Sequence, residues 1–511
     1  MHMNIKVKDM SHFVRSFIFF RSELGTEYLF DDVTGIVLQI PSEINSRVKH
    51  ILLDSTTPTE ALVKIRKEAM EENNYSGIYR ILEILISHFG AFYRLPLETY
   101  TFEIGEDMLR YMILRDGLYE LLLEVTNNCN FRCRYCVFGG SYKDFRTHGH
   151  SFMTQEIAIK AIDLYFDYLE EGAFLNPKRE PTIAFYGGEP LLNFKIIEKC
   201  VNYTNHKYSD EFTPRYTITT NAALINKRIA EFLVKNDFDV SISLDGPKNE
   251  HDRNRILPNG RGTFDLVMRG ISNLKEAQKK YGSKKEYFAL VTYDPKSNLY
   301  NMAKFFDEES PIRPIIANPV RSMGTTYYSL FTTEDYINHE RMLRELFKKF
   351  LKDSKNNHNS VFLEILFGGP GTLMFYRNIL SRKNPTATFT STCIPGFKWY
   401  VTTDGKIQVC ERASPITIIG DINEGLNFSA IKTLIQKYFK LINKKCNYCS
   451  LAHSCARCFA YLGSEDCSLF KRWVIDGLKT AFTIYENNPE YFERRLSILK
   501  EKGGVYELEN L

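Results

Sequence analysis

The chain has 511 residues, of which 44% are hydrophobic and 25% charged, a composition typical of a folded protein. Its formal net charge is +4, from 66 basic and 62 acidic residues, so charge gives no reason to expect nucleic acid or a membrane as a partner. The sequence lacks an apolar run of about 18 residues and a signal-peptide pattern, so we expect no membrane span and a cytoplasmic location.

Residues 1–105 contain no cysteine and are predicted to form a small α+β module with an apolar core. Runs of β-branched and aromatic residues indicate strands, and longer segments with helical spacing of apolar residues indicate helices. The expected strands are 17–20 and 34–40, and the expected helices are 42–53, 58–72 and 78–89.

Strands and helices then alternate from about residue 117 to 320. The expected strands are 119–126, 182–186, 215–220, 240–244, 287–293 and 313–318, with helices at 154–171, 193–207, 226–236, 263–280 and 298–308. Repeated strand–helix units predict a parallel sheet with right-handed crossovers. Six units predict an α/β fold, a partial (β/α)6 barrel whose ligand lies at the carboxyl ends of the strands.

We divide the chain into five segments on this pattern. They are the α+β module at 1–105, the partial barrel at 106–335, a helical connector at 336–390, a cysteine-rich domain at 391–480 and a helical tail at 481–511.

Three of the eleven cysteines lie close together after the first barrel strand, with the spacing Cys129-x3-Cys133-x2-Cys136. A 4Fe–4S cubane normally takes four thiolates, so three on one short loop leave one iron open for a substrate or cofactor. A zinc loop or plain buried thiols are the alternatives, although structural zinc usually takes four ligands. Cys200 stands alone in a predicted helix and is expected to be a buried core thiol.

At these cysteines the chain resembles the radical SAM superfamily, over about residues 117–320. The resemblance implies that the amino and carboxylate groups of S-adenosylmethionine (SAM) chelate the open iron. It also implies that an electron from the cluster breaks a C–S bond of SAM and yields a 5′-deoxyadenosyl radical.

The segment Tyr186-Gly187-Gly188-Glu189-Pro190 resembles the GGEP motif of the same family. Glycines let the backbone approach a ligand closely, and Glu189 is implied to accept a hydrogen bond from the SAM ammonium. A simple turn at Gly187 and Gly188 is the alternative.

Four further residues match SAM-contacting positions of the family. Asn221 and Ser243 end the third and fourth strands, and Arg255 is implied to pair with the SAM carboxylate. Tyr135, the aromatic residue before the last cysteine, is implied to pack near the adenine. The alternative for Asn221, Ser243 and Arg255 is that they are ordinary polar residues near strand ends.

A second array holds the other seven clustered cysteines. Its pattern is Cys393-x11-Gly405-x4-Cys410, followed by Cys446-x2-Cys449-x5-Cys455-x2-Cys458-x8-Cys467. Two zinc sites are the obvious alternative, but seven cysteines do not fill two four-cysteine sites.

The second array resembles the SPASM domain that follows many radical SAM cores, with one departure. Cys455 and Cys458 are separated by two residues rather than the usual three. The resemblance implies two auxiliary 4Fe–4S clusters, which makes three clusters in the chain. The nearer one would be held by Cys393, Cys410 and Cys458, and the outer one by Cys446, Cys449, Cys455 and Cys467.

The nearer auxiliary cluster then has only three protein ligands, because Ile394–Val409 contains no cysteine. A soft thiolate is the natural fourth ligand, and the cysteine of a substrate could bind there and be deprotonated by the metal. Glu411 follows Cys410, at the place where formylglycine-forming relatives have an aspartate that resembles a general base. Glu411 is therefore the candidate catalytic residue, with a plain surface glutamate as the alternative.

An α+β unit before such a core resembles the winged-helix element with which peptide maturases bind a leader peptide. A peptide could add as a strand beside Phe17–Phe20, although a structural cap on the barrel is the alternative. We therefore predict a maturase that installs thioether links in a cysteine-containing, ribosomally made precursor with a leader, as in sactipeptides and ranthipeptides. The reductant would be a flavodoxin or ferredoxin. The other possibilities are an anaerobic sulfatase-maturing enzyme, a C–C peptide crosslinker, and a non-catalytic iron–sulfur or zinc scaffold.

Overall fold

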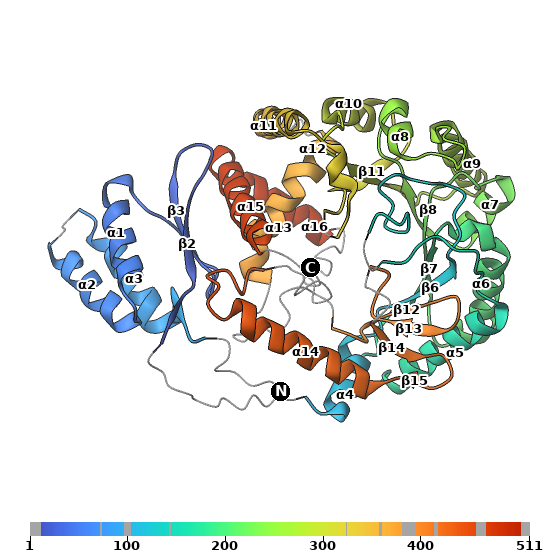
Figure 1. Cartoon of the computed structure of the whole chain (residues 1–511), viewed down its shortest axis with the longest axis horizontal. Helices are drawn as coiled ribbons and strands as arrows, with labels where there is room; N and C mark the ends of the chain where they lie inside the picture. The colour runs from blue at the N-terminus through green and yellow to red at the C-terminus, as the bar shows by residue number, and fades with distance from the viewer. Residues whose placement is uncertain are drawn as a thin grey trace.

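The computed structural model of the chain describes residues 12–71, 74–96, 104–142, 145–322, 324–356, 360–380, 394–412, 417–455 and 467–501. Its largest element is a ten-stranded sheet with the order β11-β10-β9-β8-β7-β6-β12-β13-β14-β15. Figure 1 shows this sheet and its helices at the right and the N-terminal module at the left. The helices α13, α14 and α15 lie between the two in that view.

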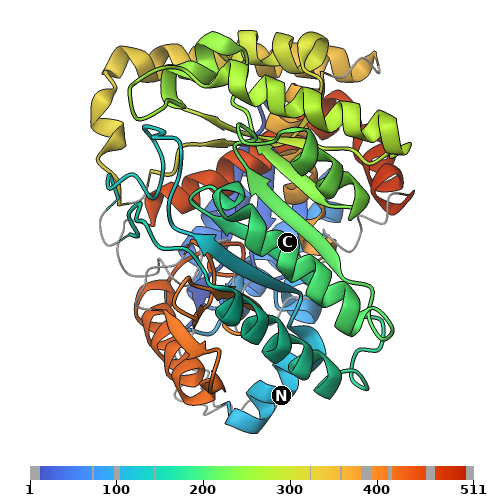
Figure 2. The ribbon, with the colours of Figure 1, turned by 90° about the vertical axis from the view of Figure 1, so that its right-hand side faces the viewer.

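Six parallel neighbours in sequence order form the barrel part of the sheet. They are β6 (Glu120–Thr126), β7 (Thr182–Gly187), β8 (Arg215–Thr220), β9 (Asp239–Ser243), β10 (Phe288–Tyr293) and β11 (Arg313–Pro319). The helices are α5 (Gln155–Glu171), α6 (Phe194–Tyr208), α7 (Lys227–Lys235), α8 (Lys248–Asn254), α9 (Phe264–Tyr281) and α10 (Leu299–Lys304). Figure 2 shows α5 and α6 in front of the strands and running roughly along them. The mostly parallel α/β sheet that the sequence predicts is confirmed, with each strand end within two residues of its expected place.

The two faces of the barrel strands differ, because side chains alternate along a strand. On β6, Leu121, Leu123 and Val125 are fully buried in the main core under the helices. Leu122 points to the other face, where it packs with Ala184 and with Tyr400 from β12. The hydrophobic cluster on that inner face is therefore much smaller than the main core on the helix side.

The sheet continues past the barrel into the cysteine-rich segment. Strand β12 (Lys398–Val401) pairs in parallel with β6, and β13 (Lys406–Gln408), β14 (Ile418–Asp421) and β15 (Gly425–Leu426) follow in antiparallel order. These strands were not predicted from the sequence. They join residues on both sides of the expected boundary at 390/391 into one sheet, and the five-segment division itself stays a prediction.

Helices account for most of the remaining described chain. They are α4 (Glu106–Asp116), α11 (Thr333–Lys355), the short α12 (Val361–Leu363), α13 (Gly369–Leu380), α14 (Phe428–Cys446), α15 (Ser468–Asn487) and α16 (Glu490–Glu501). In the part of the chain that the structure describes, no helix combines the length and the apolar character needed to span a bilayer.

The N-terminal module is a three-stranded antiparallel sheet followed by three helices. Its elements are β2 (Phe17–Arg21), β3 (Glu27–Asp31), β4 (Val37–Gln39), α1 (Ser42–Asp54), α2 (Pro58–Glu71), α3 (Ser76–Phe89) and the small pair β1 (Val14–Arg15) and β5 (Tyr93–Arg94). The unpredicted β3 is buried on both faces: Leu29 lies in the module's own core, and Tyr28 and Phe30 lie in the main core. Whether the module is a winged-helix recognition element stays a prediction.

Candidate functional site

The loop that carries Cys129, Cys133 and Cys136 begins where β6 ends, and all three thiols are half-buried. Its start is fixed locally, since the Asn128 side chain accepts the Cys129 N–H at 2.8 Å. The Phe131 N–H donates to the sulfur of Cys129 at 3.4 Å, and the Cys136 N–H donates to the carbonyl of Cys133 at 3.1 Å. The loop is thus held by its own hydrogen bonds, with its three thiols on a stretch of eight residues.

Gly187 and Gly188 bring the end of β7 against the start of this loop. The N–H of Gly188 donates to Thr126 O and that of Glu189 to Asn128 O, both at 2.9 Å. A Cβ on Gly188 would lie 2.2 Å from Asn128 O, and Gly187 has a φ of 135°, which an L side chain rarely adopts. The glycines therefore permit a close approach of backbone to backbone, and their approach to a ligand stays a prediction.

The carboxylate of Glu189 ties the ends of β7 and β8 together. It accepts hydrogen bonds from the Leu191 N–H at 3.1 Å, the Thr220 hydroxyl at 2.6 Å and the Asn221 N–H at 2.8 Å. Burial raises its pKa to about 7, against the opposing effect of these three donors. The side chain of Asn221 in turn donates to Asn130 of the cysteine loop at 2.8 Å. Both residues therefore position the loop, and their contact with SAM stays a prediction.

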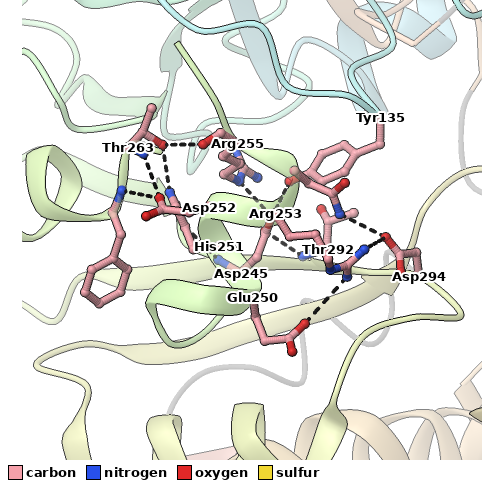
Figure 3. A network of polar contacts seen from close by, with 12 residues as sticks. Tyr135, Asp245, Glu250, His251, Asp252, Arg253, Arg255, Thr263, Thr292 and Asp294 are labelled. Atoms are coloured by element: carbon pink, nitrogen blue, oxygen red, sulfur yellow. Dashed lines mark hydrogen bonds and ion pairs between the residues drawn. The ribbon is translucent and has the colours of Figure 1, made fainter. Parts of the chain in front are cut away.

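Tyr135, Asp245 and Arg255 form a buried triad beside the cysteine loop (Figure 3). One oxygen of Asp245 accepts the Tyr135 hydroxyl and, at 3.0 Å, the Nε–H of Arg255. The other oxygen accepts the Thr292 N–H of β10 at 3.0 Å, and the Arg255 guanidinium lies 5.4 Å from the centre of the Tyr135 ring. The expected contacts of Tyr135 with adenine and of Arg255 with the SAM carboxylate stay predictions, while their mutual contact is established.

His251 contacts the same triad through the backbone of Asp245 and through Thr263. Thr263 gives its hydroxyl proton to the carbonyl of Arg255 at 2.8 Å, so the Nε2 of His251, 3.1 Å from that hydroxyl, carries its own proton. The Nδ1 is then the acceptor for the Asp245 N–H at 3.4 Å. Burial lowers the pKa of His251 to about 3, so the ring is neutral.

A second buried network, which the sequence did not indicate, holds the segment that faces the cysteine loop. Asp294 accepts Arg253 at 2.7 Å, Asn254 at 2.9 Å and the Tyr327 hydroxyl at 2.8 Å. The carbonyl of Asn254 accepts the Arg134 N–H at 3.0 Å. The loop is therefore braced on this side as well, and only the packing of distant residues could reveal it.

The expected site residues that the structure describes after β6, β7, β8 and β9 thus meet at the carboxyl ends of the strands. Ser243 is half-buried at the end of β9. Within the described residues, no three histidine, cysteine, aspartate or glutamate side chains converge as ligands of a single metal ion would. A cubane spreads its thiolates over separate irons, so three thiols on one loop fit that group. Burial, followed by the charge of Glu189, raises the pKa of Cys129 to about 12, so a bound metal would have to displace the thiol proton.

Cys410 follows β13, and its surroundings reach back to the first cysteine loop. Arg146, ten residues after Cys136, donates to Gln408 at 3.0 Å and to the carbonyl of Cys410 at 3.3 Å. Its guanidinium stacks on the ring of Tyr400 at 4.1 Å. The cysteine-rich segment and the first loop therefore meet on the inner face of the sheet.

Glu411 is not the surface glutamate that we had considered as an alternative, since 14% of its side chain is exposed. It pairs with Lys398 at 3.0 Å, and Lys398 pairs also with Glu120 at 2.6 Å. Burial would raise the pKa of Glu411, but Lys398 and Arg412 outweigh it and hold that pKa below its usual value. Its role as a catalytic base stays a prediction.

Of the outer set of cysteines, Cys446 ends α14, and Cys449 and Cys455 lie in the irregular segment that follows it. Cys467 directly precedes α15. Cys393 and Cys458, which we assigned to the nearer cluster, lie outside the described residues. The partition of the seven cysteines, and the number of auxiliary clusters, therefore stay predictions.

Comparison with known proteins identifies the barrel part of the chain. Residues 123–293 match the model of the Radical SAM superfamily. The chain contains a radical SAM domain. The match confirms the radical SAM domain that the sequence predicts, for which the superfamily implies a 4Fe–4S cluster and SAM. The activity of the whole chain stays a proposal.

Three relatives resemble this chain over different lengths. MJ0907 of Methanocaldococcus jannaschii, an uncharacterized protein, is 39% identical over 33% of this chain and 52% of its own length. The cysteine-type anaerobic sulfatase-maturating enzyme of Clostridium novyi is 25% identical over 58% of this chain and 74% of that enzyme. The radical SAM cyclopropyl synthase TigE of Paramaledivibacter caminithermalis is 32% identical over 30% of this chain and 32% of the synthase. This chain thus spans about half of the first relative and a third of the last.

The solved structure of histidine-tagged anSMEcpe with bound AdoMet shares the fold. It aligns with a TM-score of 0.55 and 22% identity, over 76% of this chain and 98% of anSMEcpe. About a quarter of this chain therefore has no counterpart there. The N-terminal module lies outside the segment that matches the superfamily model.

Proposed function

We propose that this chain is a maturase that installs thioether crosslinks between cysteine sulfur and carbon in a ribosomally made precursor peptide. The observation that carries the proposal is the contact of Arg146 with Cys410. It joins the loop that carries Cys129, Cys133 and Cys136 to Cys410, which we assign to the nearer auxiliary cluster. A substrate thiol bound at the incompletely ligated nearer cluster would then lie beside the inner face of the barrel.

When bound, SAM and the clusters would supply the carbon-centred radical and would take up the one electron that is released when the C–S bond forms. The chain's own residues orient the substrate and handle the proton. Lys398 keeps Glu411 ionised, so this carboxylate can take up the thiol proton beside Cys410. Glu124, on the same inner face of β6, lies 3.7 Å from Arg146, so this buried ion pair helps to hold Arg146 at Cys410.

The N-terminal module supports a peptide as the substrate. The sheet order β2-β3-β4 leaves β2, which contains Phe17–Phe20, at one edge and the half-exposed β4 at the other. We propose that an extended leader peptide adds to an edge of this sheet, beside Phe17–Phe20 as the sequence predicts. The partners that we propose are accordingly a cysteine-containing precursor with a leader and a flavodoxin or ferredoxin as reductant.

A second candidate is the sulfatase-maturing reaction, which the similarity to the Clostridium novyi enzyme favours. A third is C–C crosslinking, favoured by the shorter similarity to the cyclopropyl synthase. The three reactions differ in their products: a thioether consumes a thiol, formylglycine carries an aldehyde, and a C–C link leaves thiols intact.

The test is to incubate the anaerobically reconstituted chain with SAM, dithionite and a cognate cysteine-containing precursor. We expect each link to remove about two hydrogens from the peptide mass and one titratable thiol. The Cys410→Ala variant should still cleave SAM but form no link, whereas Cys129→Ala should do neither. A hydrazide-reactive product would indicate formylglycine, and an unchanged peptide mass would contradict all three reactions.

A further inference from the structure

Arg94 of the N-terminal module donates hydrogen bonds to the loop that carries Cys446, Cys449 and Cys455. This residue ends β5 and is almost fully buried. A single nitrogen, Nη2, donates to the carbonyls of Cys446 at 3.1 Å, Asn447 at 2.9 Å and Cys449 at 3.0 Å. The first turn of the loop therefore closes around a side chain that lies more than 350 positions away in the sequence.

Asp32 of the module accepts hydrogen bonds from the other end of the same loop. It directly follows β3 and is fully buried. Its two oxygens accept the N–H groups of His453 and Ser454, both at 2.8 Å. The backbone of Asp32 is fixed in turn, since its N–H donates to Ser16 O at 2.7 Å. One basic and one acidic side chain of the module thus bracket the segment from Cys446 to Cys455.

The module also braces the helix that begins after Cys467. Ser22, Thr26 and Tyr28 all donate to the carboxylate of Glu486 on α15, at 3.1, 3.0 and 2.9 Å. The N–H of Glu23 donates to the hydroxyl of Thr483 at 2.9 Å. All four cysteines assigned to the outer cluster therefore lie on segments that contact the N-terminal module.

Fixing this loop from outside has a physical reason. Residues 447–455 belong to no helix or strand, so they have no ladder of backbone hydrogen bonds to set their shape. Five hydrogen bonds from two charged side chains replace that ladder, and bonds to charged groups are strong. The loop is consequently preorganised only when the module is in place.

We propose that the N-terminal module is a structural part of the outer cysteine site, with Arg94 and Asp32 as positioning residues that hold the Cys446–Cys455 loop ready to take up its iron–sulfur cluster. The inference rests on the proposed auxiliary site and not on the product that the enzyme forms. Because coupling between two sites is reciprocal, loading of the outer cluster should also stabilise the module.

The experiment compares Asp32→Asn and Arg94→Met with Asp31→Asn, all in the full chain. Asp31 is the matched control, because it is equally buried and adjacent but bonds within the module, to Thr34 and to the Phe92 N–H. After reconstitution we expect about 12 iron atoms per chain in the parent and the control, and about 8 in the two test variants. SAM cleavage with dithionite should stay unchanged in all of them.

Hydrogen exchange of the iron-free chains gives a second measurement that needs no activity. The amides of 446–455 should exchange about tenfold faster or more in Asp32→Asn and Arg94→Met than in Asp31→Asn, because the bonds that hold the loop are lost. Equal iron and equal exchange in all three variants would overturn the proposal, as would an equal loss in the control. Unchanged iron in a Cys446→Ser, Cys449→Ser double variant would also overturn it, whatever the peptide product is.

Discussion

Asp245 connects three parts of the radical SAM site through one carboxylate. It holds Tyr135 of the cysteine loop, Arg255 of the loop after α8, and the backbone of Thr292 on β10. Charge-assisted hydrogen bonds of this kind are strong and directional, so the orientation of both aromatic ring and guanidinium depends on Asp245. The residue acts by positioning groups that the family resemblance places against SAM.

Replacing Asp245 by Asn should therefore weaken SAM binding by about tenfold, because one charged acceptor for two donors is lost. Equilibrium binding of SAM to the reconstituted chain measures the effect. Asp252→Asn is the control, since Asp252 accepts the N–H groups of Thr263 and Phe264 rather than those of the triad. Equal SAM affinity in the two variants would show that Asp245 has no such positioning role.

Glu189 should give the iron-free chain a pH-dependent stability. Folding raises the pKa of this carboxyl from 4.5 to about 7, so folding favours its protonated form. Its contribution is complete below pH 4.5 and is lost as the pH rises through about 7, a total of about 3 kcal/mol. His251 acts in the opposite sense between about pH 3 and 6.5, because folding lowers its pKa.

The effect of Glu189 is thus isolated by comparing the parent chain with Glu189→Gln. Denaturant unfolding between about pH 4.5 and 8 should show the parent losing stability relative to the variant as the pH rises. Parallel pH profiles of the two chains would mean that Glu189 titrates normally.

At the scale of elements, the end of β7 packs closely against the start of the cysteine loop. Gly188→Ala would place a methyl group 2.2 Å from Asn128 O, and backbone on both sides leaves no flexible side chain to yield. We expect the variant to lose about 3 kcal/mol or more of unfolding free energy and to hold about four fewer iron atoms per chain. Gly77→Ala in α3 is the control, because a Cβ there meets nothing within 4 Å. Full iron content in Gly188→Ala would contradict this account.

The sequence predicted the strand–helix units of the barrel because each unit is a local pattern. It missed β3, whose residues Tyr28, Leu29 and Phe30 are all buried and so do not alternate. It also missed β12, because this strand pairs with β6 across nearly 280 residues of sequence. The site residues also differ in whether a local pattern or a distant contact reveals them. Spacing predicted the cysteines and Glu189, whereas the network around Asp294 depends on packing between distant segments.

At the scale of the whole molecule, the N-terminal module packs directly against the C-terminal helices. Phe20 and Tyr28 of the module lie against Phe482 of α15, with ring centres 5.7 and 4.8 Å away, and belong to the main core. Figure 1 shows α15 beside the strands of the module. Because the module shares a core with the C-terminal helices, its motions should be coupled to the cysteine-rich segment.

Glu486 provides a direct measure of that coupling. Changing Glu486 to Ala removes the carboxylate that accepts Ser22, Thr26 and Tyr28, at a cost of about 2 kcal/mol. We expect the amides of β2 and β3 to lose exchange protection first, while those of β6–β9 keep theirs, since the partners of Glu486 belong to the module. The control is Glu490→Ala, whose side chain is 78% exposed and pairs with Arg494 on its own helix. If Glu486→Ala left the exchange of β2 and β3 unchanged, the three hydrogen bonds to Glu486 would not contribute to the docking of the module.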